Sequence, residues 1–192
     1  DRLGAYAEAQ AVPAARAVRI PDALTFEQAA AVFDHGLTAH YLTQTTFAVR
    51  QGHRVLVQAG AGGVGSLVVQ MAKRAGATVY ATVSTAAKAA LVESLGADAT
   101  IRYRDRECAQ AVHELTGGAG VHVVYDSVGQ DTIDASIASL APRGTLVLYG
   151  QSSGAVHAID PAVLADRGSL FFTRPHLLDH IATPTALATR AD

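Results

Sequence analysis

The sequence contains one cysteine, Cys108, one methionine and no tryptophan among its 192 residues. A lone cysteine excludes an intrachain disulfide and a cysteine-rich zinc site. No run of about 18 apolar residues occurs, so we expect no membrane-spanning helix. The formal net charge is only −2, which excludes a strong basic field for holding nucleic acid or anionic lipid. We therefore expect a globular protein without nucleic-acid or membrane partners, and its cysteine content is compatible with the cytoplasm.

Signatures of metal and nucleophilic catalysis are also missing. The eight histidines do not follow metal-ligand spacing: His35 and His40 lie five residues apart, with no cysteine or second acid to complete a set. We therefore expect no metal site. The absence of G-x-S-x-G argues against a hydrolase, and Cys108 is expected to be an inert surface or half-buried thiol. No residue is assigned as a catalytic acid or base.

Short apolar runs alternate with helical patterns after residue 53. We expect strands at 54–58, 78–83, 99–103, 121–125, 144–149 and 169–173, and helices at 66–75, 86–95, 106–115, 132–140 and 161–165. This alternation predicts parallel βαβ units with right-handed crossovers. Six strands complete a doubly wound dinucleotide fold. The expected fold class is α/β, with a six-stranded doubly wound parallel sheet in three α/β/α layers.

The first 24 residues differ from the rest of the chain, because their short apolar runs are broken by prolines and cannot form a core alone. Thr25 stands three residues before Gln28, the spacing of a capping box at the start of a helix. Gly36 is expected to split this region into two helices. We expect residues 1–24 to be the tail of another domain, and residues 25–192 to form one domain.

A glycine-rich turn joins the first strand to the next helix. Gly60-Ala61-Gly62-Gly63-Val64-Gly65 matches G-x-G-x-x-G in the strand-to-helix context of a Rossmann dinucleotide site. Gly60 would allow a tight turn, Gly62 would let backbone amides approach a pyrophosphate, and Gly65 would let the helix pack closely on its strand. The helix N-terminus would offer free N–H groups and a partial positive charge. The alternative is a plain turn whose glycines are needed for positive φ.

The strand after this turn indicates which dinucleotide binds. NAD-selective sites place an acid about 20 residues beyond the glycines, but here the strand ends Thr-Val-Ser-Thr at residues 82–85. Ser84 could donate to a 2′-phosphate, and Lys88 one turn later could pair with it. An ordinary surface role for Lys88 stays open. Tyr103 could flank the adenine or be a partly exposed core tyrosine. The pattern favours NADPH.

The other candidate residues follow later strands, because ligands of open parallel sheets bind beyond the carboxyl ends of the strands. We expect Ser127 and Gly129 beneath the cofactor ribose and nicotinamide, and Gly150 and Gln151 near the nicotinamide amide. Ordinary loop roles fit these four equally well. Asp126 is more consistent with a turn cap than with a catalytic group.

Several motifs together resemble one family. They are GLTAHYL at 36–42, AGAGGVG at 59–65, STAAKAA around Lys88, IRYRDRE around Tyr103, VYDSVG at 124–129 and TRP at 173–175. In this order and spacing they resemble the quinone oxidoreductase (zeta-crystallin-like) branch of the zinc-independent medium-chain dehydrogenase/reductase superfamily, over nearly the whole chain. Zinc-dependent relatives carry a cysteine ligand just before the helix that contains Gly36; residues 33–35 here are Phe-Asp-His.

The resemblance implies a cofactor, a reaction and an assembly. NADP would be the cofactor, and NADPH would reduce quinones or α,β-unsaturated carbonyls without zinc. Lys88 and Tyr103 match positions that handle the 2′-phosphate, and Thr38 and Tyr41 match a helix near the nicotinamide. Residues 169–173 match an edge strand through which family dimers pair, which would also cover an apolar edge.

The resemblance also implies that the N-terminal GroES-like catalytic domain, except for its tail, and a closing C-terminal segment are missing. We therefore expect this chain to bind NADPH but to catalyse slowly or not at all.

Three other interpretations stay open. The chain could be the enoyl reductase unit of a larger synthase, which resembles the same branch. It could be a non-catalytic NADPH-binding protein, with RNA binding as in some zeta-crystallins, although its mild negative charge argues against RNA. A purely structural dimerisation module would leave the glycine turn and Lys88 without a role.

Overall fold

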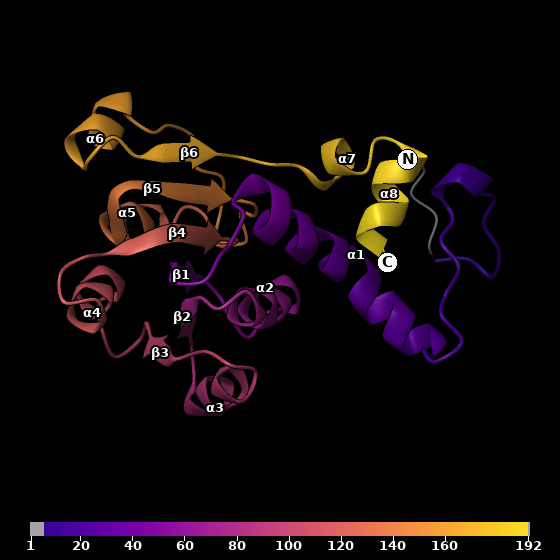
Figure 1. The fold of residues 1–192 in the computed structure, drawn as a ribbon, viewed down its shortest axis with the longest axis horizontal. Helices are drawn as coiled ribbons and strands as arrows, with labels where there is room; N and C mark the ends of the chain where they lie inside the picture. The colour runs from indigo at the N-terminus through magenta and orange to yellow at the C-terminus, as the bar shows by residue number, and fades with distance from the viewer. Residues whose placement is uncertain (1–5, 192) are drawn as a thin grey trace.

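The computed structural model of the chain, which describes residues 6–191, is built around one six-stranded sheet (Figure 1). Its strands are β1 (Arg54–Val57), β2 (Thr78–Val83), β3 (Ala99–Arg102), β4 (Val121–Asp126), β5 (Leu140–Leu148) and β6 (Phe171–Thr173). They lie in the order β3-β2-β1-β4-β5-β6, and every neighbouring pair is parallel. The strand order reverses between β1 and β4, as in a doubly wound sheet. The predicted fold class is confirmed.

Helices cover both faces of this sheet (Figure 1). They are α1 (Phe26–Tyr41), α2 (Gly63–Arg74), α3 (Ala86–Ser94), α4 (Cys108–Leu115), α5 (Ile133–Ala138), α6 (Pro161–Asp166), α7 (Leu177–His180) and α8 (Pro184–Ala191), with a 3₁₀ turn at Ala14–Arg16 and a π-helical turn at Leu42–Thr46. Helices α1, α2 and α3 share one apolar core with the sheet, and α4 and α5 share another with the opposite face. The three predicted layers are therefore present.

Strand β1 shows why the sheet needs helices on both sides. Val55, Leu56 and Val57 are completely buried. Successive side chains of a strand point to opposite faces, so Val55 and Val57 pack in the core with Val68 of α2, whereas Leu56 packs in the core with Val112 of α4. A continuous apolar strand of this kind is typical of a parallel sheet covered on both faces.

Two predicted helix boundaries were wrong. Helix α1 runs without interruption through Gly36, where an added Cβ would meet nothing within 4 Å. Glycine in a helix interior costs only about 1 kcal/mol, and the packing of α1 against α2 is compatible with that cost. The predicted capping box is confirmed, because Thr25 and Gln28 bond each other reciprocally. Helix α2 begins at Gly63, three residues earlier than predicted, so it includes part of the glycine turn.

Strand β5 and the segment after β6 also differ from the prediction. Residue Leu140, expected at the end of a helix, begins β5, which contains a register shift opposite β4. Helices α7 and α8 were not predicted. They lie against α1, where the ring of His180 stacks on Tyr41 with centroids 4.1 Å apart, and Leu187 packs near Leu37. Short polar helices of this kind depend on tertiary contacts rather than on a periodic pattern.

The segment before α1 lies outside the sheet, beside α8 (Figure 1). Between residues 6 and 25 the structure has the 3₁₀ turn and no strand. The guanidinium group of Arg16 donates to the carbonyl oxygen of Ile181 at 3.2 Å, which joins this segment to the C-terminal helices. Residues 1–5 of the expected tail and Asp192 lie outside the described residues.

Candidate functional site

Apart from Thr38 and Tyr41, the predicted site residues follow five neighbouring strands in one row. Backbone hydrogen bonds connect this row: Tyr103 N–H donates to Val83, Gly60 N–H donates to Thr82, and Gln58 N–H donates to Tyr125. In sheet order, the loops carry Tyr103, Ser84, Gly60, Ser127 and Gly150. Four strand spacings cover about 19 Å. The row crosses the reversal of strand order between β1 and β4, where open parallel sheets bind extended ligands.

The glycines of the turn are needed for close packing. A Cβ on Gly60 would lie 2.7 Å from the Cβ of Ala81 on β2, and a Cβ on Gly65 would lie 2.5 Å from the carbonyl oxygen of Ala59. None of Gly60, Gly62, Gly63 and Gly65 has positive φ; the left-handed residue is Ala59, with φ of +53°. The expectation that these glycines are needed for positive φ is therefore wrong. The tight turn expected at Gly60 is made by Ala59, which has the left-handed backbone. The close packing expected of Gly65 agrees with the distances above.

The first turn of α2 offers unpaired backbone donors. Gly62 is its N-cap and supplies no side chain, and the first helical bond runs from Ser66 N–H to Gly62. Among the described residues, no group accepts from the N–H groups of Gly63, Val64 or Gly65. Gly62 and Gly63 are exposed. Three free N–H groups at the positive end of a helix form a site suited to a phosphate.

The end of β2 is suited to a second phosphate. Thr85 caps α3 by accepting from Lys88 N–H at 3.3 Å, and this leaves the lysine side chain exposed in the first helical turn. Within residues 6–191, the Lys88 ammonium forms no ion pair or hydrogen bond. Ser84 is half-buried and Tyr103 is 53% exposed. The structure therefore brings these three predicted residues to neighbouring strands without an acidic side chain at residues 82–85.

Two loops on the other side of the strand reversal pack directly together. Gly129 has φ of +93°, and a Cβ on it would lie 2.7 Å from the carbonyl oxygen of Gly154. A Cβ on Gly150 would lie 2.5 Å from the carbonyl oxygen of Ser127. Gln151 is exposed beside Gly129. The glycines let both loops approach closely, so the four residues predicted near the ribose and nicotinamide form one surface.

Asp126 acts as a turn cap, as the sequence indicates. Its carboxylate is fully buried and accepts from the N–H groups of Val128 and Gly129 and from the hydroxyls of Thr132 and Ser136. These donors satisfy the carboxylate and fix the start of the loop that carries Ser127. All of these donors belong to the protein itself, which agrees with a structural role for Asp126.

Thr38 and Tyr41 lie on α1, away from free surface. Thr38 is 8% exposed and Tyr41 is 2% exposed. Burial raises the pKa of Tyr41 to about 12, with Asp34 adding to that effect and Arg174 opposing it. The phenol is therefore neutral at ordinary pH. Contact of these two residues with a nicotinamide stays a prediction.

The structure also adds residues that the sequence did not single out for this site. Gln58 and Thr82 hydrogen-bond each other beneath the glycine turn, and Ser136 continues the contact towards Asp126. A polar Gln58 at the end of an apolar strand was the available signal for this cluster. His35 of α1 lies against Gly63, and no sequence motif pointed to that contact.

Metal ligation and cysteine chemistry have no support in the side chains. Within residues 6–191, no three His, Cys, Asp or Glu side chains meet as potential metal ligands. Cys108 is buried, and burial raises the pKa of its thiol to about 11. No helix among the described residues is long and apolar enough to cross a membrane.

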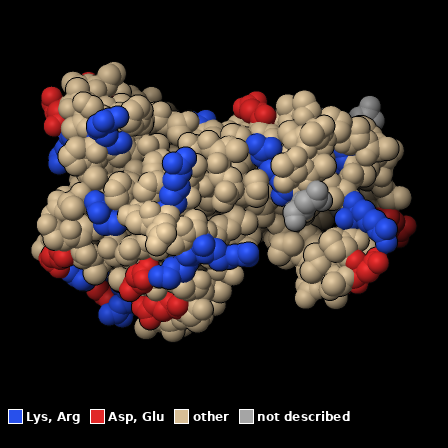
Figure 2. Space-filling view, viewed as in Figure 1, with Lys and Arg blue, Asp and Glu red and all other residues tan. Residues whose placement is uncertain are grey.

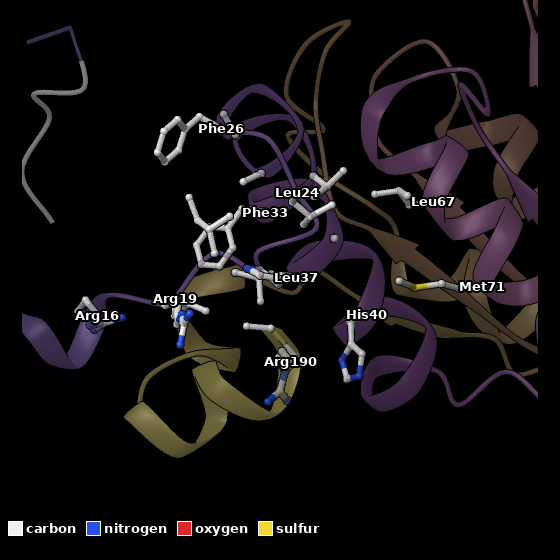
Figure 3. Close-up of a pocket in the computed structure, with 18 residues that line it drawn as sticks. Arg16, Arg19, Leu24, Phe26, Phe33, Leu37, His40, Leu67, Met71 and Arg190 are labelled. Carbon is white, nitrogen blue, oxygen red and sulfur yellow. The ribbon is translucent and has the colours of Figure 1, made fainter. Parts of the chain in front are cut away.

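A separate apolar pocket of about 660 Å³ lies beside α1 (Figure 3). Leu24, Phe33 and Leu37 line it, Leu67 and Met71 of α2 close one side, and arginines from the N-terminal segment and α8 lie at its edge. Phe26 at its edge is 81% exposed. An apolar pocket with exposed aromatic rings at its edge is typical of a contact with another chain segment or a ligand.

Residues 63–180 match the family model described as zinc-binding dehydrogenase. The chain belongs to this family. A quinone oxidoreductase of Pseudomonas aeruginosa is 44% identical over 99% of this chain and 58% of its own length. The crystal structure of Escherichia coli quinone oxidoreductase complexed with NADPH has a TM-score of 0.88, with 42% identity over 91% of this chain and 53% of that chain. The expected resemblance is confirmed.

Other relatives are named for different reactions. A 2-haloacrylate reductase of a Burkholderia species is 42% identical over 94% of this chain and 55% of its own length. A highly reducing polyketide synthase of a fungal species is 36% identical over 77% of this chain, but that covers only 6% of the synthase. The chain therefore spans little more than half the length of the reductases it matches.

Proposed function

We propose that this chain is the NADPH-binding half of an oxidoreductase that reduces a quinone or an α,β-unsaturated carbonyl. The observation that carries the proposal is the pair of phosphate sites on one row: three free N–H groups begin α2, and an unpaired Lys88 stands where an NAD-selective site would carry an acid. Two similar proteins, one mycobacterial and one from Escherichia coli, were solved with NADPH, which supports the same cofactor here.

The residues divide the binding of this cofactor between them. The N–H groups of Gly63, Val64 and Gly65 hold the pyrophosphate, and Lys88 and Ser84 bind the 2′-phosphate. Tyr103 flanks the adenine. The loops at 127–129 and 150–151 orient the ribose and nicotinamide. Bound NADPH supplies the hydride; the protein contributes orientation and exclusion of water. The reaction proceeds without zinc in this proposal.

The chain forms one side of the active site. We propose that residues 1–24 belong to the neighbouring domain of the longer protein, and that this domain covers the apolar pocket beside α1. The support is the exposure of Phe26 and the apolar lining of that pocket. The chain alone would then bind NADPH while reducing quinones slowly or not at all.

The edge of the sheet supports a homodimer. Strand β6 pairs with β5 on one side only, and Phe171 is 56% exposed on this edge. Pairing of two copies along residues 169–173 would cover unpaired backbone groups and apolar rings.

Basic and acidic side chains are interspersed on the face shown in Figure 2, which argues against RNA binding. We propose a cytoplasmic protein with a small-molecule substrate.

The test is a titration of the purified chain with NADPH and with NADH, followed by nicotinamide fluorescence. We expect NADPH to bind more tightly, and Lys88→Ala to weaken NADPH binding roughly 10- to 100-fold with little effect on NADH. Arg74→Ala removes an exposed charge at the other end of α2 and should change neither affinity. Equal affinity for both cofactors would overturn the NADPH preference, and binding of neither would overturn the cofactor role of this chain.

A second candidate is the enoyl reductase unit of a larger synthase. The observation in its favour is the 36% identity to a polyketide synthase over three quarters of this chain. Both candidates share the cofactor and differ in the acceptor. Full-length protein assayed with a thioester enone and with a quinone separates them, because a synthase unit would reduce the thioester far faster.

A further inference from the structure

The imidazole of His35 on α1 lies directly against the first residue of α2. A Cβ built on Gly63 would come within 2.5 Å of His35 Nδ1 and 3.0 Å of its Nε2. Only glycine therefore fits at position 63 while His35 keeps its place. The contact brings a side chain from α1 next to the free N–H groups that begin α2.

His35 has the properties of a ligand-binding side chain. It is half-buried, and within residues 6–191 neither ring nitrogen forms a hydrogen bond or ion pair. Its ring nitrogens are therefore available to form a hydrogen bond with a ligand. A packing role alone would be filled better by an apolar residue.

We propose that His35 donates a hydrogen bond to the pyrophosphate of the bound dinucleotide. The phosphate is then held between α1 and α2, with backbone donors on one side and the imidazole on the other. This inference rests on the proposed function and adds to it a residue that the glycine motif does not contain.

The contact also relates the residue types at positions 35 and 63 to each other. Gly63 is exposed and has ordinary helical φ, so its backbone conformation does not require glycine. His35 alone restricts the space above it. The ring of His35 and the first residue of α2 are therefore sterically coupled.

Two ligands separate this contact from the rest of the site. NADPH contains the pyrophosphate, whereas adenosine 2′-monophosphate occupies only the adenine and 2′-phosphate end of the row. We would measure both dissociation constants by calorimetry for the wild-type chain, His35→Phe and His35→Gln. Phenylalanine keeps a ring over Gly63 without a donor, and glutamine keeps a donor without the ring. His113→Gln on α4, across the sheet, is the control.

We expect His35→Phe to weaken NADPH binding roughly 5- to 20-fold, the size of one hydrogen bond to a charged group at a half-exposed site. Glutamine should recover most of that loss. Adenosine 2′-monophosphate should bind all variants within about twofold of wild type, which also shows that they are folded. Lys88→Ala should weaken both ligands.

An unchanged NADPH affinity in His35→Phe overturns the proposal while leaving the cofactor assignment intact. An equal loss for both ligands also overturns it, because that pattern reports a general disturbance of the fold. If wild-type chain binds neither ligand, the proposed function fails, and the role of His35 fails with it.

Discussion

Ser136 Oγ donates a hydrogen bond to Asp126 Oδ2 at 2.7 Å, and both side chains are completely buried. The contact is one end of a chain of hydrogen bonds. Gln58 Nε2 donates to Ser136 Oγ at 3.0 Å, Thr82 Oγ1 donates to Gln58 Oε1 at 2.8 Å, and the N–H of Ala59 donates to Thr82 Oγ1 at 3.0 Å. These bonds join the loop after β4 to the glycine turn after β1, so the two halves of the candidate site share one buried polar support.

Removing the middle of this chain should destabilise the protein. Ser136→Ala removes the oxygen acceptor of Gln58 Nε2 and one of the donors to Asp126, which keeps its other donors, so we expect the free energy of unfolding to fall by about 1–3 kcal/mol. Ser139→Ala is the matched control, because Ser139 is equally buried, but its hydroxyl bonds Ala135 of the preceding helical turn and the Cys108 thiol rather than this chain. Its loss should stay below about 1 kcal/mol. Urea denaturation measures both, and equal losses would show that the chain of bonds has no special role.

Steric conflict between positions 35 and 63 gives a second prediction. Gly63→Ala places a methyl group against the ring of His35, a half-buried side chain that can shift, so we expect a slightly lower melting temperature, equivalent to about 1 kcal/mol. His35→Ala removes the ring, and the double variant should recover most of the stability lost in Gly63→Ala. Thermal unfolding of the four proteins forms a double-mutant cycle. Additive losses would mean that the imidazole can move aside at no cost.

The fold could be predicted because its main elements depend on local patterns. Apolar strands such as 54–57 are buried on both faces, and the break before Gly96 agrees with its φ of +110°, as a left-handed cap requires. The row of site loops followed from strand order alone. Elements held by tertiary contact could not be predicted. Helix α8 is short and largely polar, so the spacing of its apolar residues does not indicate that it packs on α1.

The detailed geometry of the site was partly beyond the sequence for a similar reason. The glycine motif indicated a phosphate turn, but the residue with positive φ is Ala59, just before the motif, and Gly60 instead packs closely against β2. The contact between His35 and Gly63 joins residues 28 positions apart across two helices. Such a contact follows from how α1 crosses α2, which no single-sequence pattern contains.

Cys108 should be unreactive in the folded protein. Burial raises the pKa of its thiol to about 11, and Asp126 and Glu107 act in the same direction. The thiolate, which is the reactive form, is therefore scarce at pH 8. We expect a chromogenic disulfide reagent to label the native chain at least about 100-fold more slowly than the urea-unfolded chain. Rapid labelling of native protein would contradict this burial.

Stability should fall in mild acid because of two neighbouring histidines. Burial lowers the pKa of His53 and His122 below the ordinary value of 6.5, and Arg50 and Arg54 act in the same direction on His53 and His122, respectively. In addition, the Nδ1 atom of His122 accepts the N–H of Arg54 at 2.9 Å, and a protonated Nδ1 could not accept it. The folded state therefore favours the neutral rings.

The sign follows from linkage. The histidines take up protons near pH 6.5 in the unfolded chain but only at a lower pH in the folded chain. The stability that they contribute is therefore fully present above pH 6.5 and decreases as the pH falls from 6.5 through the lower pKa of the folded state. His122→Gln retains an acceptor for the N–H of Arg54 and cannot titrate, so its urea midpoint should decrease less than that of wild type between pH 7.5 and about 5.5. Identical pH dependence in the two proteins would mean that His122 is protonated equally easily in both states and contributes nothing to acid sensitivity.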